Sequence, residues 1–206
     1  MFVAMMIKRF VFILLCGVCL HACSDSAVLN PIPSDGAILA FGDSLTVGVG
    51  VSKEYSYPAV LQHLSERRVV SAGGSGEETQ QGLGRLPDEL DQVQPDLVVL
   101  LQGGNDILRN RNLQKSKQNL ASMIELIQSK DIDVLLVGVP AKKLFSDVAP
   151  LYKQLADEYK LVFVEDVLSG LLRNNEFKSD AVHLNEQGYR ILAESIHETL
   201  VKNGAL

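Results

Sequence analysis

Hydrophobic positions form two alternating patterns from Ala37 onward. Short and nearly unbroken apolar runs predict strands at 37–41, 69–72, 97–101, 134–139 and 161–164. Segments with helical spacing of apolar residues lie between and after them, at 58–67, 79–93, 113–130, 146–159 and 185–203. Strands that are apolar throughout are typical of a parallel sheet covered on both faces. The alternation therefore predicts an α/β fold, a three-layer α/β/α sandwich around a five-stranded parallel sheet with right-handed crossovers.

The amino-terminal part has a different pattern, which is typical of an exported protein. Lys8 and Arg9 precede an apolar run at 10–20 that is too short to span a bilayer. The run ends in Leu20-His21-Ala22-Cys23, which resembles the lipobox of bacterial lipoproteins. We therefore expect a lipoprotein signal peptide at 1–22, a tether lipidated on Cys23 at 23–36, and one domain at 37–206. The alternative is an ordinary signal peptide or an uncleaved anchor, with Cys23 incidental.

Cysteine usage and charge narrow the classes of partner. Cys16 and Cys19 would leave with the signal peptide, so neither an internal disulfide nor a cysteine metal site is expected. The formal net charge of −6 argues against nucleic acid or anionic lipid as an electrostatic partner. Ser24, after the cysteine, favours the outer membrane by resemblance to lipoprotein sorting. The expected location is the periplasmic side of the bacterial envelope, lipid-anchored, with a soluble periplasmic protein as the alternative.

A candidate nucleophile follows the first predicted strand, in Gly42-Asp43-Ser44-Leu45. The turn after a strand can expose a serine hydroxyl and aim backbone amides at a developing oxyanion. Serine is a weak nucleophile unless a base takes its proton, so Ser44 requires a histidine. The alternative interpretation is that Asp43 or Ser44 caps the next helix.

The candidate base is His183, in Asp180-Ala181-Val182-His183. It lies on a loop before the last predicted helix, with Asn185 as the expected N-cap. Asp180 is close enough in sequence to orient the imidazole and to stabilise its protonated form. By contrast, His63 and His197 fall inside predicted helices. An Asp–His pair at this spacing is often structural, so its interpretation as catalytic depends on the other sequence blocks.

Two glycine-rich blocks supply candidate oxyanion donors. Asn105, in Gly103-Gly104-Asn105-Asp106, can donate from its side-chain amide, whereas Asp106 is expected to cap a helix or brace the loop. Gly76, in a glycine-rich loop after the second strand, can donate from its backbone; Gly74 is the alternative. An ordinary turn explains the first block equally well on its own. The second block lacks the lysine of a phosphate-binding loop.

Together the four blocks resemble those of the SGNH (GDSL-type) hydrolases, over about residues 37–200. The block at 80–87 and the Gly-Gly-Asn-Asp block are similar to periplasmic acyl-thioesterase, lysophospholipase and arylesterase enzymes. The resemblance implies a flavodoxin-like sandwich, a Ser44–His183–Asp180 triad, and an oxyanion hole from the amides of Ser44, Gly76 and Asn105. The second block departs from the family pattern, because Ser71 replaces an asparagine and Glu77-Glu78 replaces Asp-Thr.

The sequence therefore predicts a monomeric serine esterase without metal or cofactor. Its expected substrate is a small-molecule or lipid ester or thioester, cleaved through an acyl-enzyme on Ser44. Two alternatives remain: a carbohydrate O-deacetylase of the cell envelope, and a non-catalytic envelope-binding lipoprotein. The expected partners are the ester and, through the lipid on Cys23, a membrane; nucleic acid is not expected.

Overall fold

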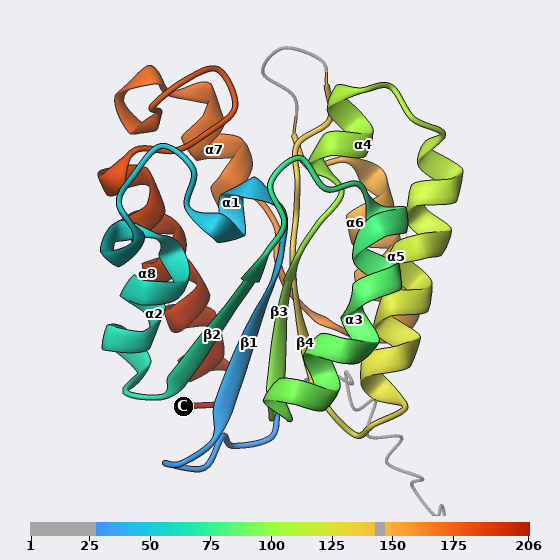
Figure 1. Ribbon diagram of the computed structural model, residues 1–206, viewed down its shortest axis with the longest axis vertical. Coiled ribbons are helices and arrows are strands. Elements are labelled where there is room, and N and C mark those ends of the chain that lie inside the picture. Colours follow the sequence, from blue (N-terminus) through green and yellow to red (C-terminus); the bar gives the residue numbers. More distant parts are fainter. Residues whose placement is uncertain (1–27, 143–146) are drawn as a thin grey trace, which may run out of the picture.

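A parallel five-stranded sheet forms the centre of the computed structural model, which describes residues 28–142 and 147–206 (Figure 1). The sheet order is β2-β1-β3-β4-β5, and every neighbouring pair is parallel. The strands are β1 Ala37–Gly42, β2 Arg68–Gly73, β3 Leu97–Leu101, β4 Asp133–Val137 and β5 Val162–Val164. Because β1 and β3 are buried on both faces, their uninterrupted apolar sequences are explained.

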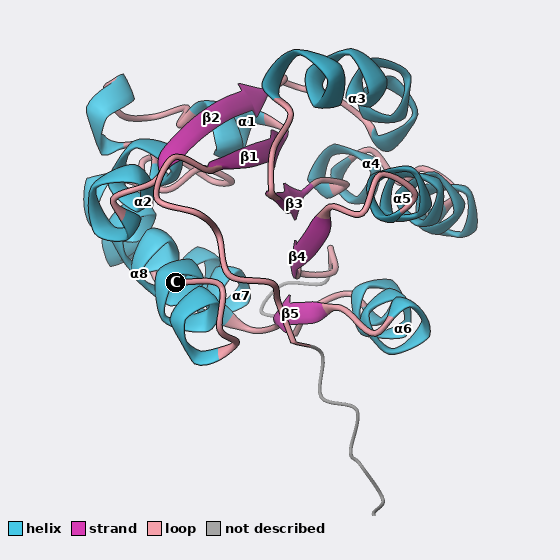
Figure 2. Ribbon diagram, turned by 90° about the horizontal axis from the view of Figure 1, so that it is seen from below, coloured by secondary structure: helices cyan, strands magenta, loops and turns pink. Residues whose placement is uncertain are grey.

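Helices cover both faces of the sheet (Figure 2). One layer contains α2 Tyr57–Ser65, α7 Val167–Arg173 and α8 Glu186–Lys202, and the other contains α3 Thr79–Val93, α5 Leu113–Gln128 and α6 Pro150–Tyr159. Short elements complete the fold: α1 Ser44–Val47, α4 Gly104–Leu108, and the 3-10 turns η1 Lys53–Tyr55 and η2 Asn175–Phe177. The predicted α/β/α sandwich with a five-stranded parallel sheet is thus confirmed.

Most predicted boundaries agree with the structure to within two residues. α3 begins and ends where the sequence predicts, and the Asn185 side chain caps α8 by accepting from the Gly188 amide at 3.0 Å. The largest difference is the start of α6, which lies at Pro150 rather than at residue 146. Proline is favoured in the first turn of a helix because its fixed φ suits the helix and its missing N–H is not needed there.

Three short helices at the carboxyl ends of the strands were not predicted. α1 follows β1 after one residue, α4 follows β3 after two residues, and α7 follows β5. α1 and α4 have four and five residues, so a hydrophobic period of 3.6 cannot be recognised in them. These helices matter here because α1 begins with Ser44 and α4 contains Asn105.

The predicted tether at 23–36 is wrong from Leu29 onward. Leu29 and Ile32, which the sequence analysis places in a tether, are buried in the domain. The amides of these two residues donate to the carbonyls of Asn203 and Ala205, at 3.1 and 2.8 Å. Leu29 and Ile32 therefore belong to the folded domain. The expected signal peptide at 1–22 and the candidate lipidation site Cys23 lie outside the described residues.

Within residues 28–142 and 147–206, no helix combines the length and the apolar character needed to cross a bilayer.

Asp106 links three helices beneath the carboxyl ends of the strands. Its buried carboxylate accepts from the Thr79 amide at 2.8 Å and from the Thr79 hydroxyl at 2.7 Å. It also accepts from the Ser116 hydroxyl, at 2.8 Å. One side chain thus joins the starts of α3, α4 and α5, in agreement with its interpretation as a loop brace.

Removal of this carboxylate is expected to destabilise the fold. Asp106→Ala leaves the Thr79 amide and hydroxyl without their acceptor and takes from the Ser116 hydroxyl the shorter of its two contacts, so it should lower the free energy of unfolding by about 3 kcal/mol. Urea denaturation measures the change. The matched control is Asp91→Ala, which removes an exposed ion pair with Lys130 and should cost less than about 1 kcal/mol. Equal losses in the two variants would contradict the bracing role.

Candidate active site

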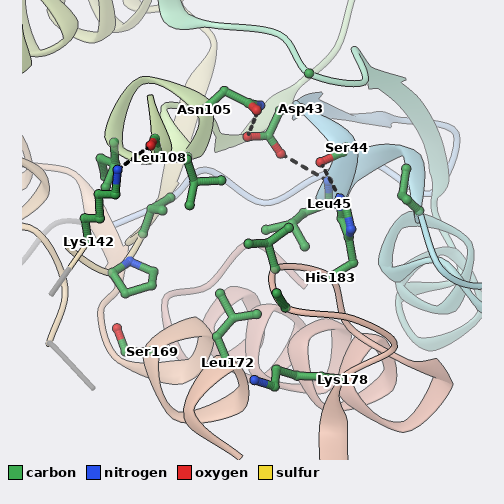
Figure 3. Close-up of a pocket in the computed structure, with 18 of the residues that line it drawn as sticks. Asp43, Ser44, Leu45, Asn105, Leu108, Lys142, Ser169, Leu172, Lys178 and His183 are labelled. Atoms are coloured by element: carbon green, nitrogen blue, oxygen red, sulfur yellow. Dashed lines mark hydrogen bonds between the residues drawn. The ribbon is translucent and has the colours of Figure 1, made fainter. Parts of the chain in front are cut away.

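Ser44 occupies the first position of α1, immediately after β1 ends at Gly42. Asp43 is the N-cap of this helix, and its carboxylate accepts from the Leu45 amide at 3.1 Å. The cap fixes the turn in which the Ser44 hydroxyl points to His183 (Figure 3). Asp43 therefore does cap the helix, and it leaves the adjacent serine free to make a different contact.

His183 lies on the loop between η2 and α8, where Asp180 organises both the backbone and the imidazole. One carboxylate oxygen of Asp180 accepts from the amides of Val182 and His183, each at 2.8 Å. The other oxygen contacts His183 Nδ1 at 2.7 Å. His183 Nε2 lies 3.0 Å from the Ser44 hydroxyl oxygen. The structure thus brings the three candidate triad residues into one hydrogen-bonded chain.

Two contacts keep the loops of Ser44 and His183 together. Gly50, with φ +101°, lies so close to Ser179 that a Cβ atom would come within 2.2 Å of the serine hydroxyl. The hydroxyl of Tyr189, in the first turns of α8, donates to the Val49 carbonyl at 2.8 Å. The loop after α1 is therefore fixed to the segment that contains the candidate base.

The candidate oxyanion donors face the same pocket. Ser44, Gly76 and Asn105 all line it, whereas Gly74, the alternative donor, does not belong to its lining. Gly76 has φ +73°, a left-handed conformation that favours glycine. The Asn105 amide nitrogen donates to the Glu77 carbonyl at 3.0 Å and lies 3.4 Å from the Asp43 carboxylate. The longer of these contacts is the weaker one.

The pocket has a volume of about 770 Å³ and opens next to Ser44 and His183. This volume is in the range of small-molecule sites. It extends away from the candidate triad between α4, the loop after β4, and α7 (Figure 3). Its apolar lining includes Ile107, Leu108, Val139, Pro140, Leu172 and Val182. The walls thus suit an apolar group attached to a polar reacting centre.

Asp180, in the candidate triad, and Asp43, next to Ser44, have different environments. Hydrogen bonds from His183 and from the Val182 amide lower the pKa of Asp180 to about 2. Burial raises the pKa of Asp43 to about 6, although the Leu45 amide opposes the shift. Asp180 is therefore the ionised partner that His183 meets at neutral and mildly acidic pH.

Sequence reasoning assigned no role to an ion-pair cluster behind the oxyanion candidates. Arg85 Nε contacts the Glu77 carboxylate at 2.7 Å, and the guanidinium lies 4.2 Å from the centre of the Phe41 ring. Arg85 also donates to the carbonyls of Gly42 and Ala72, at the ends of β1 and β2. The cluster thus holds Glu77, whose carbonyl accepts from Asn105. The signal that could have indicated it is the departure of Glu77 from the family pattern.

The two other histidines of the described chain lie away from the pocket. His63 is in α2 and His197 is in α8, and neither belongs to the pocket lining.

Comparison with known proteins agrees with this geometry. The GDSL-like lipase/acylhydrolase family matches residues 40–191. The chain is 32% identical over 177 residues to the arylesterase of Vibrio mimicus, covering 81% of this chain and 88% of that protein. It is also 32% identical over 168 residues to thioesterase 1/protease 1/lysophospholipase L1 of Escherichia coli K12, covering 76% of this chain and 79% of that protein.

Solved structures of similar fold also include esterases of this family. The crystal structure of TesA superposes with a TM-score of 0.71 at 30% identity, covering 80% of this chain and 97% of that one. AlinE4, described as an SGNH-hydrolase family esterase, superposes with a TM-score of 0.66 at 31% identity, covering 83% and 97%. The resemblance drawn from the four sequence blocks is confirmed. The chain belongs to the GDSL-like lipase/acylhydrolase family and is an SGNH-type esterase.

Proposed function

We propose that the protein hydrolyses carboxylic esters and thioesters through an acyl-enzyme on Ser44. The observation that carries the proposal is the continuous contact from Ser44 to His183 to Asp180, at 3.0 and 2.7 Å, at the end of an apolar pocket. A nucleophile, a base within hydrogen-bond reach and a third group that orients the base are what acyl transfer requires.

In the proposed reaction, Ser44 attacks the carbonyl carbon while His183 Nε2 takes the hydroxyl proton. The tetrahedral intermediate collapses when the imidazolium returns this proton to the leaving alcohol or thiol. Water then attacks the acyl-enzyme, with His183 again as the base, and releases the acid and free Ser44. Asp180 remains ionised throughout and stabilises the imidazolium, as its lowered pKa of about 2 favours.

We assign the oxyanion hole to the backbone amides of Ser44 and Gly76 and the side chain of Asn105. Asn105 has two amide hydrogens, and the Glu77 carbonyl engages one of them at 3.0 Å. The second amide hydrogen faces Asp43, whose carboxylate lies 3.4 Å from the amide nitrogen. This second hydrogen is the one that we assign to the oxyanion. Uncharged donors already in place stabilise the developing charge without reorganisation.

The pocket favours an acyl or aryl group over a sugar. Most of the lining is apolar, as at Leu108, Val139 and Leu172, and its polar side chains beyond the candidate triad include Lys142, Ser169 and Lys178. The names of the relatives, arylesterase and thioesterase/lysophospholipase, fit the same class of substrate. We therefore propose aryl and fatty acyl esters and thioesters as substrates.

Substitution of the nucleophile tests the mechanism. Ser44→Ala should fold normally and lose at least about three decades of kcat on a short-chain aryl ester, because no acyl-enzyme can form. The matched control is Ser75→Ala, which alters another serine that lines the pocket and should keep kcat within a few-fold. Wild-type turnover by purified Ser44→Ala would refute the assignment.

The raised pKa of Asp43 predicts a pH-dependent cost in stability. As the pH rises above about 4, this carboxyl ionises in the unfolded chain while it stays protonated in the fold until about pH 6. The contribution of this carboxyl to the free energy of unfolding is therefore largest below pH 4. About 3 kcal/mol of it is lost as the pH rises through about 6.

Asp43→Asn removes this titration. Relative to the wild type, the variant should gain stability by up to about 3 kcal/mol when the pH is raised from 4 to 7. Urea denaturation of both proteins across this range measures the gain. A difference between the two proteins that stays constant with pH would contradict the assignment.

We also propose that the protein is exported to the bacterial envelope and acylated on Cys23. The support is the signal-like sequence before Cys23 and the burial of Leu29, which leaves only a short linker between the two. Cells supplied with labelled palmitate should incorporate the label into the wild-type chain and not into Cys23→Ala. An unlabelled, soluble periplasmic wild type would instead indicate an ordinary signal peptide.

A further inference from the structure

The loop between α4 and α5 is unusual in its exposure and its charge. Eight consecutive residues, from Leu108 to Lys115, are exposed. They include three cations, and no acidic residue occurs between Asp106 and Glu125. This is a marked local excess in a chain whose formal net charge is −6.

Contacts with neighbouring elements fix this loop and add a fourth cation. Arg109 donates to the Gly76 carbonyl at 2.9 Å and to the Glu78 carboxylate at 2.8 Å. Arg111 contacts the same carboxylate at 3.0 Å. Lys142, in the loop after β4, donates to the Leu108 carbonyl at 2.7 Å and to the Asn110 side chain at 3.0 Å. Two of the four cations, Arg109 and Arg111, thus share one carboxylate, and Lys142 is held against the same loop.

We call this surface the α4–α5 ridge and define it by six residues: Leu108, Arg109, Arg111, Leu113, Lys115 and Lys142. Its two leucines are each 43% exposed, at the two ends of the connecting loop. Leu108 also lines the pocket (Figure 3). The apolar lining of the pocket thus continues onto the surface, among the cations.

We propose that the α4–α5 ridge docks the enzyme on an anionic lipid surface, with the mouth of the pocket against the lipid. Cations attract the protein to anionic head groups, and exposed leucines enter the boundary between head groups and acyl chains. Docking itself depends only on the ridge. The delivery of a lipid ester from that surface to Ser44 rests on the proposed function.

The ridge fits lipid better than other anionic partners. The ridge contains no aromatic side chain on which a nucleic-acid base could stack. Leucines between cations, continuous with an apolar pocket, match a surface that is charged outside and apolar beneath.

Vesicle binding tests the proposal on the chain from residue 23 onward. This chain contains every described element, and Cys23→Ser prevents acylation. Phosphatidylcholine vesicles with and without phosphatidylglycerol are the probes, and co-sedimentation is the readout. Binding should require phosphatidylglycerol and weaken as salt rises. Equal binding to both kinds of vesicle would overturn the proposal.

The test variant combines Leu113→Ser with Lys115→Glu, which are outside the pocket lining. It should bind anionic vesicles at least ~10-fold more weakly, because an apolar side chain is lost and a charge is reversed. The matched control makes the corresponding changes at the end of α8, Val201→Ser with Lys202→Glu, where an apolar side chain and a lysine are also exposed. Equal losses in the two variants would overturn the proposal.

Activity measurements separate this proposal from the proposed function. The ridge variant should hydrolyse a soluble aryl ester at the wild-type rate and a lysophospholipid held in anionic vesicles at least ~10-fold more slowly. Undiminished hydrolysis in vesicles would overturn docking alone, whereas an inactive wild type on soluble esters would overturn the function. A dimer that the ridge variant abolishes would show that a second copy of the chain occupies the ridge, and would also overturn lipid docking.

Discussion

The 3.0 Å hydrogen bond between Ser44 and His183 joins residues that are 139 positions apart in the chain. It exists only if the start of the fold, at β1, and its end, at α8, are docked at the same edge of the sheet. The parallel sheet supplies this constraint, because the carboxyl ends of all five strands lie at one edge. Tyr189 and Gly50 add to this constraint, because they fix the loop after α1 to α8 and to the loop that contains His183.

The polar groups beneath this edge are arranged to support the site. Asp106 joins three helix starts, and Arg85 joins the ends of β1 and β2 to Glu77. Asp43 caps α1 at the cost of a buried carboxyl whose pKa rises to about 6. Buried polar groups stabilise only when they are paired, so these networks hold the loops in one arrangement.

The two ends of the domain have different roles. Asn30 bonds Asp133 at the start of β4, so the chain enters at the amino ends of the strands (Figure 1). The pocket lies beyond their carboxyl ends. Five residues separate Cys23 from Leu29 and reach at most about 20 Å. An acyl anchor on Cys23 would therefore hold the domain by the end away from the pocket, and the α4–α5 ridge would face a different lipid surface.

The sequence alone determined the fold class, because strands buried on both faces must be apolar and amphipathic helices repeat with their own period. It also determined the candidate nucleophile, base and orienting acid, because these side chains follow strands or precede a capped helix. It did not reveal α1, α4 or α7, which are too short or too irregular in pattern to be recognised. It also placed Leu29 and Ile32 in a tether, because two isolated apolar residues do not indicate burial.

Only the tertiary structure decided which groups meet. The pairing of Arg85 with Glu77 and of Arg109 and Arg111 with Glu78 joins residues that no local pattern connects. The net charge of −6 argued against anionic lipid, yet folding brings Lys142, which lines the pocket, to a loop that already carries three cations. Net charge sums over the whole chain, whereas an interaction depends on the charges that face the partner, and folding alone places them.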